Sequence, residues 1–354
     1  MPKNNRRFIV TLLTVFALVI AFVYVRNKHN ERMQFAFGGL TMATSYSIKL
    51  IVAETVSDEK LLSIQENVDA VLKRVNSEMS PFQVGSEIYD FNKSTSTSPF
   101  EVSTDFYKVL KASKYLNEIS GGAFDPTIAP LIDLWGFGVK KVNKHKPSDD
   151  EIRQVMKYVG FGRLKLLENN NIAKENPHIQ LNLSAIAKGY AVDAIAEYLL
   201  KEGFTDFMVE VGGELYLSGL NNSKAPWHIA VQNPTINSGV GQDNVDVLAL
   251  ENTAVATSGD YRNFFKQGAE VFSHVFNPLT GKSERTNVAS ATVIADNCML
   301  ADGLATTLMV LGKEKALNLI EEIPNVEAMI IIRGSENEFE VYKSSGFTNF
   351  ELKK

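Results

Sequence analysis

An uncharged apolar segment near the N-terminus limits the architectures open to the whole chain. Phe8–Val25 contains eighteen consecutive residues without a charged side chain, which just suffices for a helix to cross the hydrocarbon core of a bilayer. A signal peptide also begins in this way, but no small-x-small cleavage site follows the segment and no cysteine stands there to accept a lipid. We therefore predict that residues 8–25 form a transmembrane anchor or an uncleaved signal, followed by a globular domain.

The residues that flank this segment bear on its orientation. Three basic residues precede it and three follow it, namely Lys3, Arg6 and Arg7, then Arg26, Lys28 and Arg32. Because these numbers are equal, the positive-inside rule does not settle the orientation. A tail of seven residues is most simply left in the cytoplasm. We expect residues 1–7 as a cytoplasmic tail, 26–34 as a tether, and 35–354 as a domain outside the cytoplasm.

The composition excludes several classes of ligand. With 45% hydrophobic and 22% charged residues, the 354-residue chain resembles ordinary folded proteins. A net charge of −5 gives no basic surplus, which argues against a nucleic-acid partner. The single cysteine, Cys298, excludes an intramolecular disulfide and a cysteine-based zinc site, and its apolar neighbours indicate a buried, inert thiol. Any bound phosphate must therefore be held by local groups.

Hydrophobic periodicity predicts an α+β domain of two closely packed lobes. Ser57 can cap a helix that extends to residue 77, and another helix is expected to start at Ser103 or Thr104 and to reach residue 118. Further helices are expected over 147–160, after Lys188–Gly189, and within 295–312. Residues 86–92 are expected to form a loop or short strand. Expected strands are 34–52 with a break at 38–39, 179–183, 208–218 around a Gly-Gly turn, 227–232, 254–257, 271–278, 289–295, 329–333 and 338–343.

The helix expected within residues 295–312 carries two hard oxygen ligands on one face. Asp302 and Thr306 are four residues apart, so a carboxylate and a hydroxyl point in the same direction. This pair suits Mg²⁺, which takes only one or two protein carboxylates and completes its shell with water and substrate phosphates. An ordinary cap at a helix start would also explain Asp302, and this segment alone does not decide between the two.

Four further segments are candidates for a ligand site, each with a plain structural alternative. Asn182–Gly189 lies at a strand-to-helix junction, where N–H groups and Lys188 could hold phosphate oxygens, or it is an ordinary turn. Residues 257–262 form either a ligand loop around Asp260 or a solvated hairpin turn. His274 stands before a polar turn, as a site residue or as a structural histidine. The aromatic residues of segment 123–138 line a flat ligand or belong to the core.

Six motifs in order resemble one family of enzymes. They are GGAFDPTIAPLIDLWGFG, LNLSAIAKGYAVD, VEVGGELYLSG, ATSGDYRNFF, SHVFNPLTGKS and ADGLATTLMVLG. The sequences and the order of these motifs are similar to those of the ApbE family, the FAD:protein FMN transferases, from about Phe37 to the C-terminus. The resemblance implies a mixed-sheet, T-fold-related catalytic domain. It also implies an enzyme that binds FAD with Mg²⁺, transfers FMN to a threonine hydroxyl of a partner protein and releases AMP.

The resemblance also implies roles for particular residues and partners. Residues expected to contact FAD are Met42, Phe82, Ala123, Phe124, Asp125, Asn182 and Lys188, and the expected Mg²⁺ ligands are the Ala185 carbonyl, Asp302 and Thr306. A base would help a threonine hydroxyl to attack, and His274 is our candidate, with Asp260 second. The expected acceptors are flavin-carrying subunits of membrane redox complexes, of the Na⁺-pumping NADH:quinone reductase or Rnf type.

Departures from the family pattern leave two other functions open. Asn182 and Asn277 stand where the family often has aspartate, Leu279 where it has arginine, and Ala43 where glycine is frequent. Asparagine keeps hydrogen bonding but removes charge. One alternative is an FAD pyrophosphatase, in which water replaces the threonine and FMN and AMP are released. The other is a flavin-binding protein without turnover.

Overall fold

The computed structural model describes residues 32–53, 56–139, 145–234, 244–260, 264–268, 270–283, 287–334 and 338–353. The predicted cytoplasmic tail, the anchor and most of the tether lie outside these ranges. Within the described ranges, no helix combines the length and apolar character that crossing a membrane requires.

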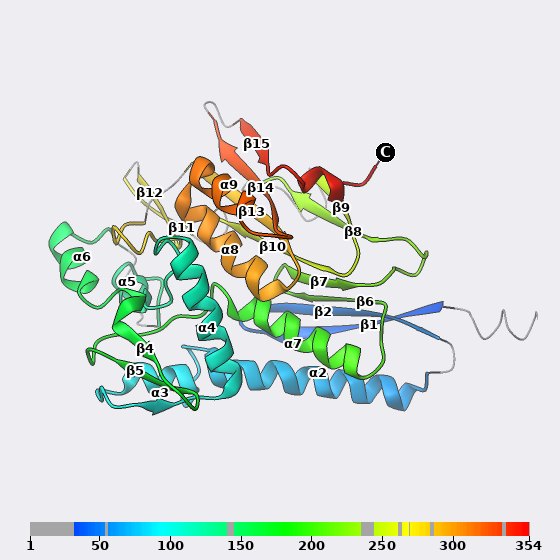
Figure 1. The fold of residues 1–354 in the computed structure, drawn as a ribbon, viewed down its shortest axis with the longest axis horizontal. Helices are drawn as coiled ribbons and strands as arrows, with labels where there is room; N and C mark the ends of the chain where they lie inside the picture. Colours follow the sequence, from blue (N-terminus) through cyan, green and yellow to red (C-terminus); the bar gives the residue numbers. More distant parts are fainter. Residues whose placement is uncertain are drawn as a thin grey trace, which may run out of the picture.

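An antiparallel sheet of eight strands forms the frame of the described domain (Figure 1). Its spatial order is β1 (Arg32–Thr41), β2 (Thr44–Ala53), β6 (Phe207–Val211), β7 (Glu214–Ser218), β10 (Thr253–Gly259), β13 (Val288–Ala295), β14 (Glu327–Arg333) and β15 (Phe339–Lys343). All neighbours pair antiparallel. The prediction of a mixed sheet is therefore wrong, since short turns such as those between β1 and β2 and between β6 and β7 reverse the chain direction.

Helices cover one face of this sheet and bury the main core (Figure 1). They are α2 (Asp58–Met79), α4 (Thr104–Ile119), α7 (Ala187–Lys201), α8 (Cys298–Leu311) and α9 (Lys313–Glu321). Alternate residues of each strand face them, as in β2, where Ile48 and Leu50 are fully buried. The opposite face is covered by the hairpin of β8 (Trp227–Gln232) and β9 (Asn244–Leu250), whose Trp227 and Leu248 form a second apolar cluster with residues of the sheet.

A third apolar cluster supports the part of the chain that carries His274. It joins α5 (Ala129–Leu134) and α6 (Asp149–Met156) to β12 (Glu270–Ser273), which pairs with β11 (Phe264–Gln267). Trp135 is 2% exposed, and its Nε1 donates to the Gly281 carbonyl at 3.1 Å. For Trp135, the structure therefore supports the core alternative. Smaller elements nearby are α3 (Glu87–Lys93), β3 (Phe100–Glu101), β4 (Leu164–Leu166) and β5 (Asn171–Lys174). The division into two lobes stays a prediction.

Capping serines set the predicted starts of the helices. The Ser57 hydroxyl accepts from the Lys60 N–H at the start of α2, and Ser103 does the same for α4. Ser148 begins α6 with a reciprocal capping box to Glu151. These predictions are confirmed because a serine before an apolar periodic segment satisfies N–H groups that the helix leaves unpaired.

The predicted break at Gly38–Gly39 is wrong, because the chain turns at Met42–Ala43. Both of these residues adopt positive φ, 48° and 58°, which closes a two-residue hairpin between β1 and β2. Gly38 instead lies inside β1, where an added Cβ would stand 2.4 Å from the Tyr46 carbonyl oxygen. It permits close approach of the paired strands rather than a turn.

Three other local predictions also need correction. Residues 87–93 form the helix α3, capped by the Ser86 hydroxyl, rather than a loop or strand. Residues 179–183 make one isolated parallel bridge, Ile128 to Gln180, and no strand. The strand predicted over 271–278 ends at Ser273, because a turn around Asn277 follows it, where Gly281 N–H donates to the Asn277 carbonyl at 2.8 Å.

Candidate functional site

The first turn of α7 meets the middle of α8 at Asp302. The Gly189 N–H donates to Asp302 Oδ2 at 2.9 Å, and the carboxylate is 2% exposed. A Cβ on Gly189 would lie 2.3 Å from the Cys298 carbonyl oxygen and 2.8 Å from the Asp302 Cβ. Only glycine allows the two helices to approach this closely. The carboxylate is thus held by a main-chain donor in the core of the domain.

Lys188 is shared between two buried carboxylates. Its Nζ lies 3.3 Å from Asp302 Oδ1 and 3.1 Å from Oε1 of Glu214, the first residue of β7. Burial by itself would lower the pKa of Lys188, but the charges of Asp302 and Glu214 outweigh it and hold the pKa above its ordinary value. Burial raises the pKa of Glu214, and Lys188 opposes that shift. Lys188 is therefore a cation, as contact with a diphosphate requires.

Two of the predicted metal ligands lie on α8, and the third, Ala185, lies in the turn just before α7. Asp302 and Thr306 occupy successive turns of α8, and the Thr306 hydroxyl lies 3.2 Å from that of Ser258 at the end of β10. Ala185 precedes Gly189 by one helical turn. Because Gly189 donates to Asp302 instead, the Ala185 carbonyl accepts no hydrogen bond from any described residue. A carboxylate, a hydroxyl and an unpartnered carbonyl are hard oxygen donors that fit Mg²⁺.

This donor set differs from a cluster of acidic and imidazole side chains. No group of three or more His, Cys, Asp or Glu residues capable of holding a metal occurs in the described ranges. Asp302 is the one carboxylate among the predicted ligands, so the proposed shell would depend on substrate phosphates and water for its remaining positions.

The start of α8 is fixed by a residue that the sequence analysis did not single out. Asp193 of α7 accepts from the Cys298 N–H at 2.7 Å and from the Met299 N–H at 2.8 Å, and Asn297 caps the same end through the Leu300 N–H. Burial raises the pKa of Asp193 to about 6. Cys298 is fully buried, which confirms the prediction of a buried thiol. Asp193 thus sets where α8, and with it Asp302, lies against α7.

Two predicted FAD contacts lie in turns that meet at one end of the sheet. Met42 is in the hairpin turn, and the neighbouring Thr41 hydroxyl accepts from Asn76 Nδ2 of α2 at 2.9 Å. Phe82 follows the end of α2 and is 60% exposed. The hydrogen bond from Asn76 therefore brings the two turns to the same end of α2. An exposed phenyl ring there is available to stack on a flat ligand.

The residues predicted to contact FAD at positions 123–125 are mostly engaged in contacts within the protein itself. Ala123 and Phe124 are buried, and Phe124 belongs to the main core. The Asp125 carboxylate accepts from the Thr127 N–H and hydroxyl through Oδ1 and from the Phe161 N–H through Oδ2. Burial raises the pKa of Asp125, whereas these donors lower it. Asp125 therefore organises its own loop and does not offer a free carboxylate.

Asn182 links this loop to the junction that precedes α7. Its N–H donates to the Pro126 carbonyl at 2.7 Å, and its Oδ1 accepts from the Ser184 N–H at 2.9 Å. It also lines a small cavity of about 70 Å³ together with Pro81, the residue before Phe82. Asn182 thus lies near the turn that carries Phe82, with its side-chain oxygen engaged in shaping the turn.

The two candidate bases have different surroundings. His274 follows β12 directly and is exposed. Asp260 is 6% exposed, and both of its carboxylate oxygens are paired with the guanidinium of Arg333, one of them at 2.8 Å. Both oxygens of this carboxylate are therefore already engaged in charge-assisted hydrogen bonds. The geometry therefore disfavours Asp260 as the base, and the role of His274 stays a prediction.

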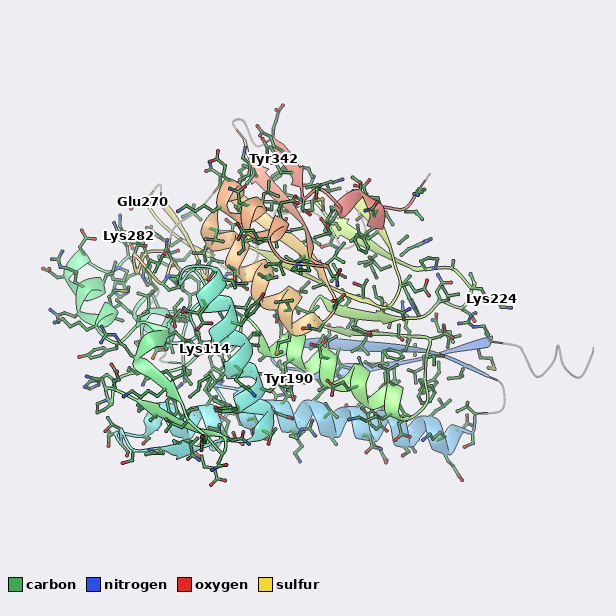
Figure 2. The ribbon with its side chains drawn as sticks, viewed as in Figure 1. Lys114, Tyr190, Lys224, Glu270, Lys282 and Tyr342 are labelled. Atoms are coloured by element: carbon green, nitrogen blue, oxygen red, sulfur yellow. The ribbon has the colours of Figure 1, made fainter. Side chains whose placement is uncertain are left out.

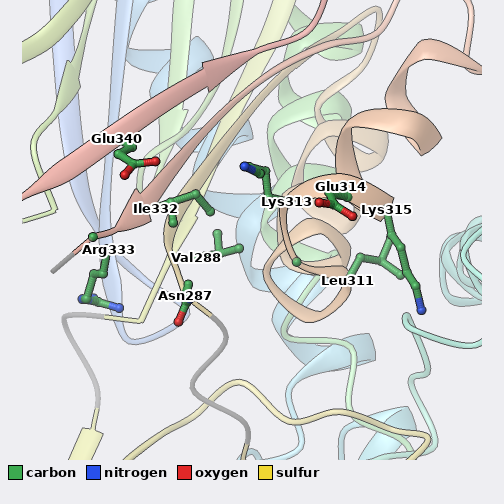
Figure 3. Close-up of a pocket in the computed structure, with 11 residues that line it drawn as sticks. Asn287, Val288, Leu311, Lys313, Glu314, Lys315, Ile332, Arg333 and Glu340 are labelled. Carbon is green, nitrogen blue, oxygen red and sulfur yellow. The ribbon is translucent and has the colours of Figure 1, made fainter.

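A separate groove of about 790 Å³ opens between α9 and the ends of β13 and β14 (Figure 3). Lys313, Arg333 and Glu340 are among the residues that line it. Arg333 links the groove to Asp260, but the groove is lined by none of the residues predicted to bind FAD or the metal. We place the candidate site at the junction of α7 and α8 because the buried charges are there, together with a carbonyl to which no described residue donates.

Comparison with known proteins identifies relatives of this chain. The family model described as "ApbE family" matches residues 42–330. The chain is 39% identical over 317 residues to an FAD:protein FMN transferase of Vibrio cholerae, covering 90% of this chain and 92% of the relative. It is 37% identical over 324 residues to an enzyme of the same name from Haemophilus influenzae, covering 90% and 91%.

Solved structures of flavin transferases have folds similar to the fold of this chain. The flavin transferase ApbE from Vibrio cholerae superposes with a TM-score of 0.81 at 38% identity, covering 90% of this chain and 99% of that one. The apo flavinyl transferase ApbE of Pseudomonas stutzeri gives 0.81 at 30% identity, covering 90% and 97%. The fold and these similarities define a transferase that acts in flavin transfer. The chain belongs to the ApbE family.

Sequence reasoning missed Glu214 and Asp193 for different reasons. Glu214 directly follows the Gly212–Gly213 turn, and nothing in this local pattern indicates its contact with Lys188. Asp193 follows Gly189 by one helical turn, which is visible in the sequence, but its partners in α8 lie 105 residues or more away along the chain. Only the packing of α7 on α8 connects them.

Proposed function

We propose that this protein transfers the FMN part of FAD to a threonine hydroxyl of a target flavoprotein subunit and releases AMP. The observation that carries the proposal is the junction of α7 and α8. There the Gly189 N–H holds buried Asp302, Lys188 adds a cation, and the Ala185 carbonyl accepts no hydrogen bond from the part of the chain that the structure describes. This arrangement offers an anionic diphosphate both a fixed positive charge and hard oxygen donors for a divalent cation.

The reaction forms one phosphorus–oxygen bond and breaks another. The threonine oxygen attacks the phosphorus on the FMN side of the diphosphate, and the bridging oxygen leaves with AMP. Ala185, Asp302 and Thr306 would hold Mg²⁺, which when bound neutralises phosphate charge as the leaving group departs. Lys188 would orient the diphosphate. His274 would accept the threonine proton, a contribution of about 10²–10⁴-fold in rate.

The membrane location and the partners are also proposals. We propose that residues 8–25 anchor the protein in the inner membrane, with the domain on the periplasmic side. The acceptors would be flavin-carrying subunits of an Na⁺-pumping NADH:quinone reductase or an Rnf-type complex. Recovery of the full chain in the membrane fraction, and of a chain lacking residues 1–31 in the soluble fraction, would test the anchor. Release of the full chain by high salt alone would contradict it.

Incubation with FAD, Mg²⁺ and a threonine-bearing acceptor peptide tests the reaction. Covalent flavin fluorescence on the peptide, with AMP released, is the expected result. Free FMN and AMP without labelling would indicate a pyrophosphatase, and intact FAD would indicate a flavin-binding protein; either outcome contradicts the proposal. Asp302→Ala should abolish labelling. Asp296→Ala is the matched control, because Asp296 is exposed and lies just before α8.

A further inference from the structure

Glu214 is a buried carboxylate next to the site, and the proposed reaction assigns it no role. Glu214 is 4% exposed, and its Oε1 lies 3.1 Å from Lys188 Nζ. Its Oε2 is buried and accepts no hydrogen bond from the described residues. A buried carboxylate oxygen without a donor costs free energy of folding. Its presence beside a catalytic lysine therefore calls for a functional reason.

The turn before Glu214 fixes this carboxylate in place. Gly212 and Gly213 adopt positive φ, and the Gly212 N–H donates to the Ser45 carbonyl at 3.0 Å. A Cβ on Gly212 would meet the Thr44 side chain at 2.9 Å and Glu214 Oε2 at 3.3 Å. The glycine turn thus leaves room for the carboxylate and holds it against Lys188.

One ammonium group serves two carboxylates in this cluster. Lys188 Nζ lies 3.3 Å from Asp302 Oδ1 and 3.1 Å from Glu214 Oε1. Two cations at close range on one carboxylate repel each other. A divalent cation on Asp302 would therefore displace the ammonium group of Lys188 from that carboxylate.

We propose that Glu214 is a positioning residue that retains Lys188 when a divalent cation binds Asp302. Lys188 is already in contact with both carboxylates, so it can move to Glu214 alone without leaving the site. The ammonium group then stays beside the diphosphate of FAD. The inference rests on the proposed cation site and adds the group that makes lysine and metal compatible there.

Binding of Mn²⁺ to the FAD-free protein, followed by electron paramagnetic resonance, measures this effect without turnover. Glu214→Gln should weaken Mn²⁺ binding on the order of tenfold, because Lys188 then has Asp302 as its remaining carboxylate partner and competes with the ion. Glu210→Gln is the matched control. Glu210 lies on β6, across the same turn, and this substitution removes the same carboxylate charge as Glu214→Gln. It should change the affinity by less than about twofold.

Repeating the measurement in a Lys188→Met protein distinguishes positioning of Lys188 by Glu214 from a direct effect of the Glu214 charge on the ion. In Lys188→Met, which has no ammonium to compete, Glu214→Gln should alter Mn²⁺ affinity by less than about twofold. An equal loss in both backgrounds would overturn the inference, because Glu214 would then act only through its charge. No loss in the unaltered background would overturn it as well. Failure of the unaltered protein to bind Mn²⁺ would instead contradict the cation site itself. Thermal unfolding of each variant confirms that the fold is kept.

Discussion

The Gly189 N–H donates to Asp302 Oδ2 at 2.9 Å, which joins the first turn of α7 to the middle of α8. This contact depends on the absence of a side chain at Gly189, because a Cβ there would lie 2.3 Å from the Cys298 carbonyl oxygen. The geometry of the candidate site is therefore set by helix packing as well as by the side chains that would bind ligand.

Gly189→Ala should separate the two helices and damage the site. The overlap falls on main-chain atoms, which cannot move aside as a flexible side chain can, so we expect a loss of about 1–3 kcal/mol in the free energy of unfolding. Flavin labelling should fall more than tenfold. Gly162→Ala is the control, because its Cβ would meet nothing within 4 Å. Equal stability and labelling for both variants would contradict the packing argument.

Asp193→Ala should release the start of α8. It removes the acceptor of the Cys298 and Met299 N–H groups at a partly buried helix end, which should cost on the order of 2–4 kcal/mol. Chemical denaturation measures this loss. Asp296→Ala should cost less than about 0.5 kcal/mol, since Asp296 is exposed. Comparable losses in the two variants would show that Asp193 does not fix the helix.

Glu78 should make the stability depend on pH. It is 7% exposed, its Oε2 accepts no hydrogen bond from the described residues, and burial, with the charges of Asp105 and Glu87, raises its pKa from 4.5 to about 7. The folded state therefore holds the proton more tightly than the unfolded state. As pH rises from about 4.5 to about 7, the free energy of unfolding should fall, and it should stay lowered above that range.

Glu78→Gln tests this sign, because glutamine removes the charge and keeps the size. At pH 8 the variant should be more stable than the unaltered protein by about 1–3 kcal/mol, at about 1.4 kcal/mol per unit of pKa shift. At pH 4.5 the two should differ little. Chemical denaturation at the two pH values measures this difference. Tyr190, labelled in Figure 2, lies on α7 with Lys108 of α4 over its ring, so the helices of this region are packed together. A stability difference that is the same at both pH values would contradict the prediction.

Asp260→Asn should lower the free energy of unfolding without changing the pH dependence of flavin labelling. The substitution breaks the paired contact with Arg333 and leaves a partly buried guanidinium, which should cost about 3 kcal/mol. The pH dependence of labelling should be unchanged, whereas His274→Ala should slow labelling and alter its pH dependence. If Asp260→Asn instead changed the pH dependence and His274→Ala did not, the assignment of the base would be reversed.

Local rules predicted the helices that begin at a serine cap and the strands around the Gly212–Gly213 turn. They failed for α3, because its seven residues are too short to establish a helical period, although Ser86 caps it. They also placed a break in the first extended segment at Gly38–Gly39, since glycine often interrupts a strand. The pairing of β1 with β2 assigns that glycine pair to close strand contact and lets Met42 and Ala43 take the positive φ angles.

For the candidate site as well, residue spacing predicted the local features but not the contacts between distant segments. The spacing of Asp302 and Thr306 was sufficient to predict that they share a face of α8. Spacing could not show that Asp260 is paired with Arg333, that the Asp125 carboxylate is used within its own loop, or that Glu214 contacts Lys188. Each of these depends on segments distant in the sequence being brought together by the fold.

Anomalous diffraction from crystals grown with Mn²⁺ and FAD locates the divalent cation. We expect one manganese peak in contact with Asp302, Thr306 and the Ala185 carbonyl, beside the FAD diphosphate, and its loss in Asp302→Ala. Bound FAD with no peak there, or with a peak elsewhere, would contradict the claim that this junction holds the catalytic cation.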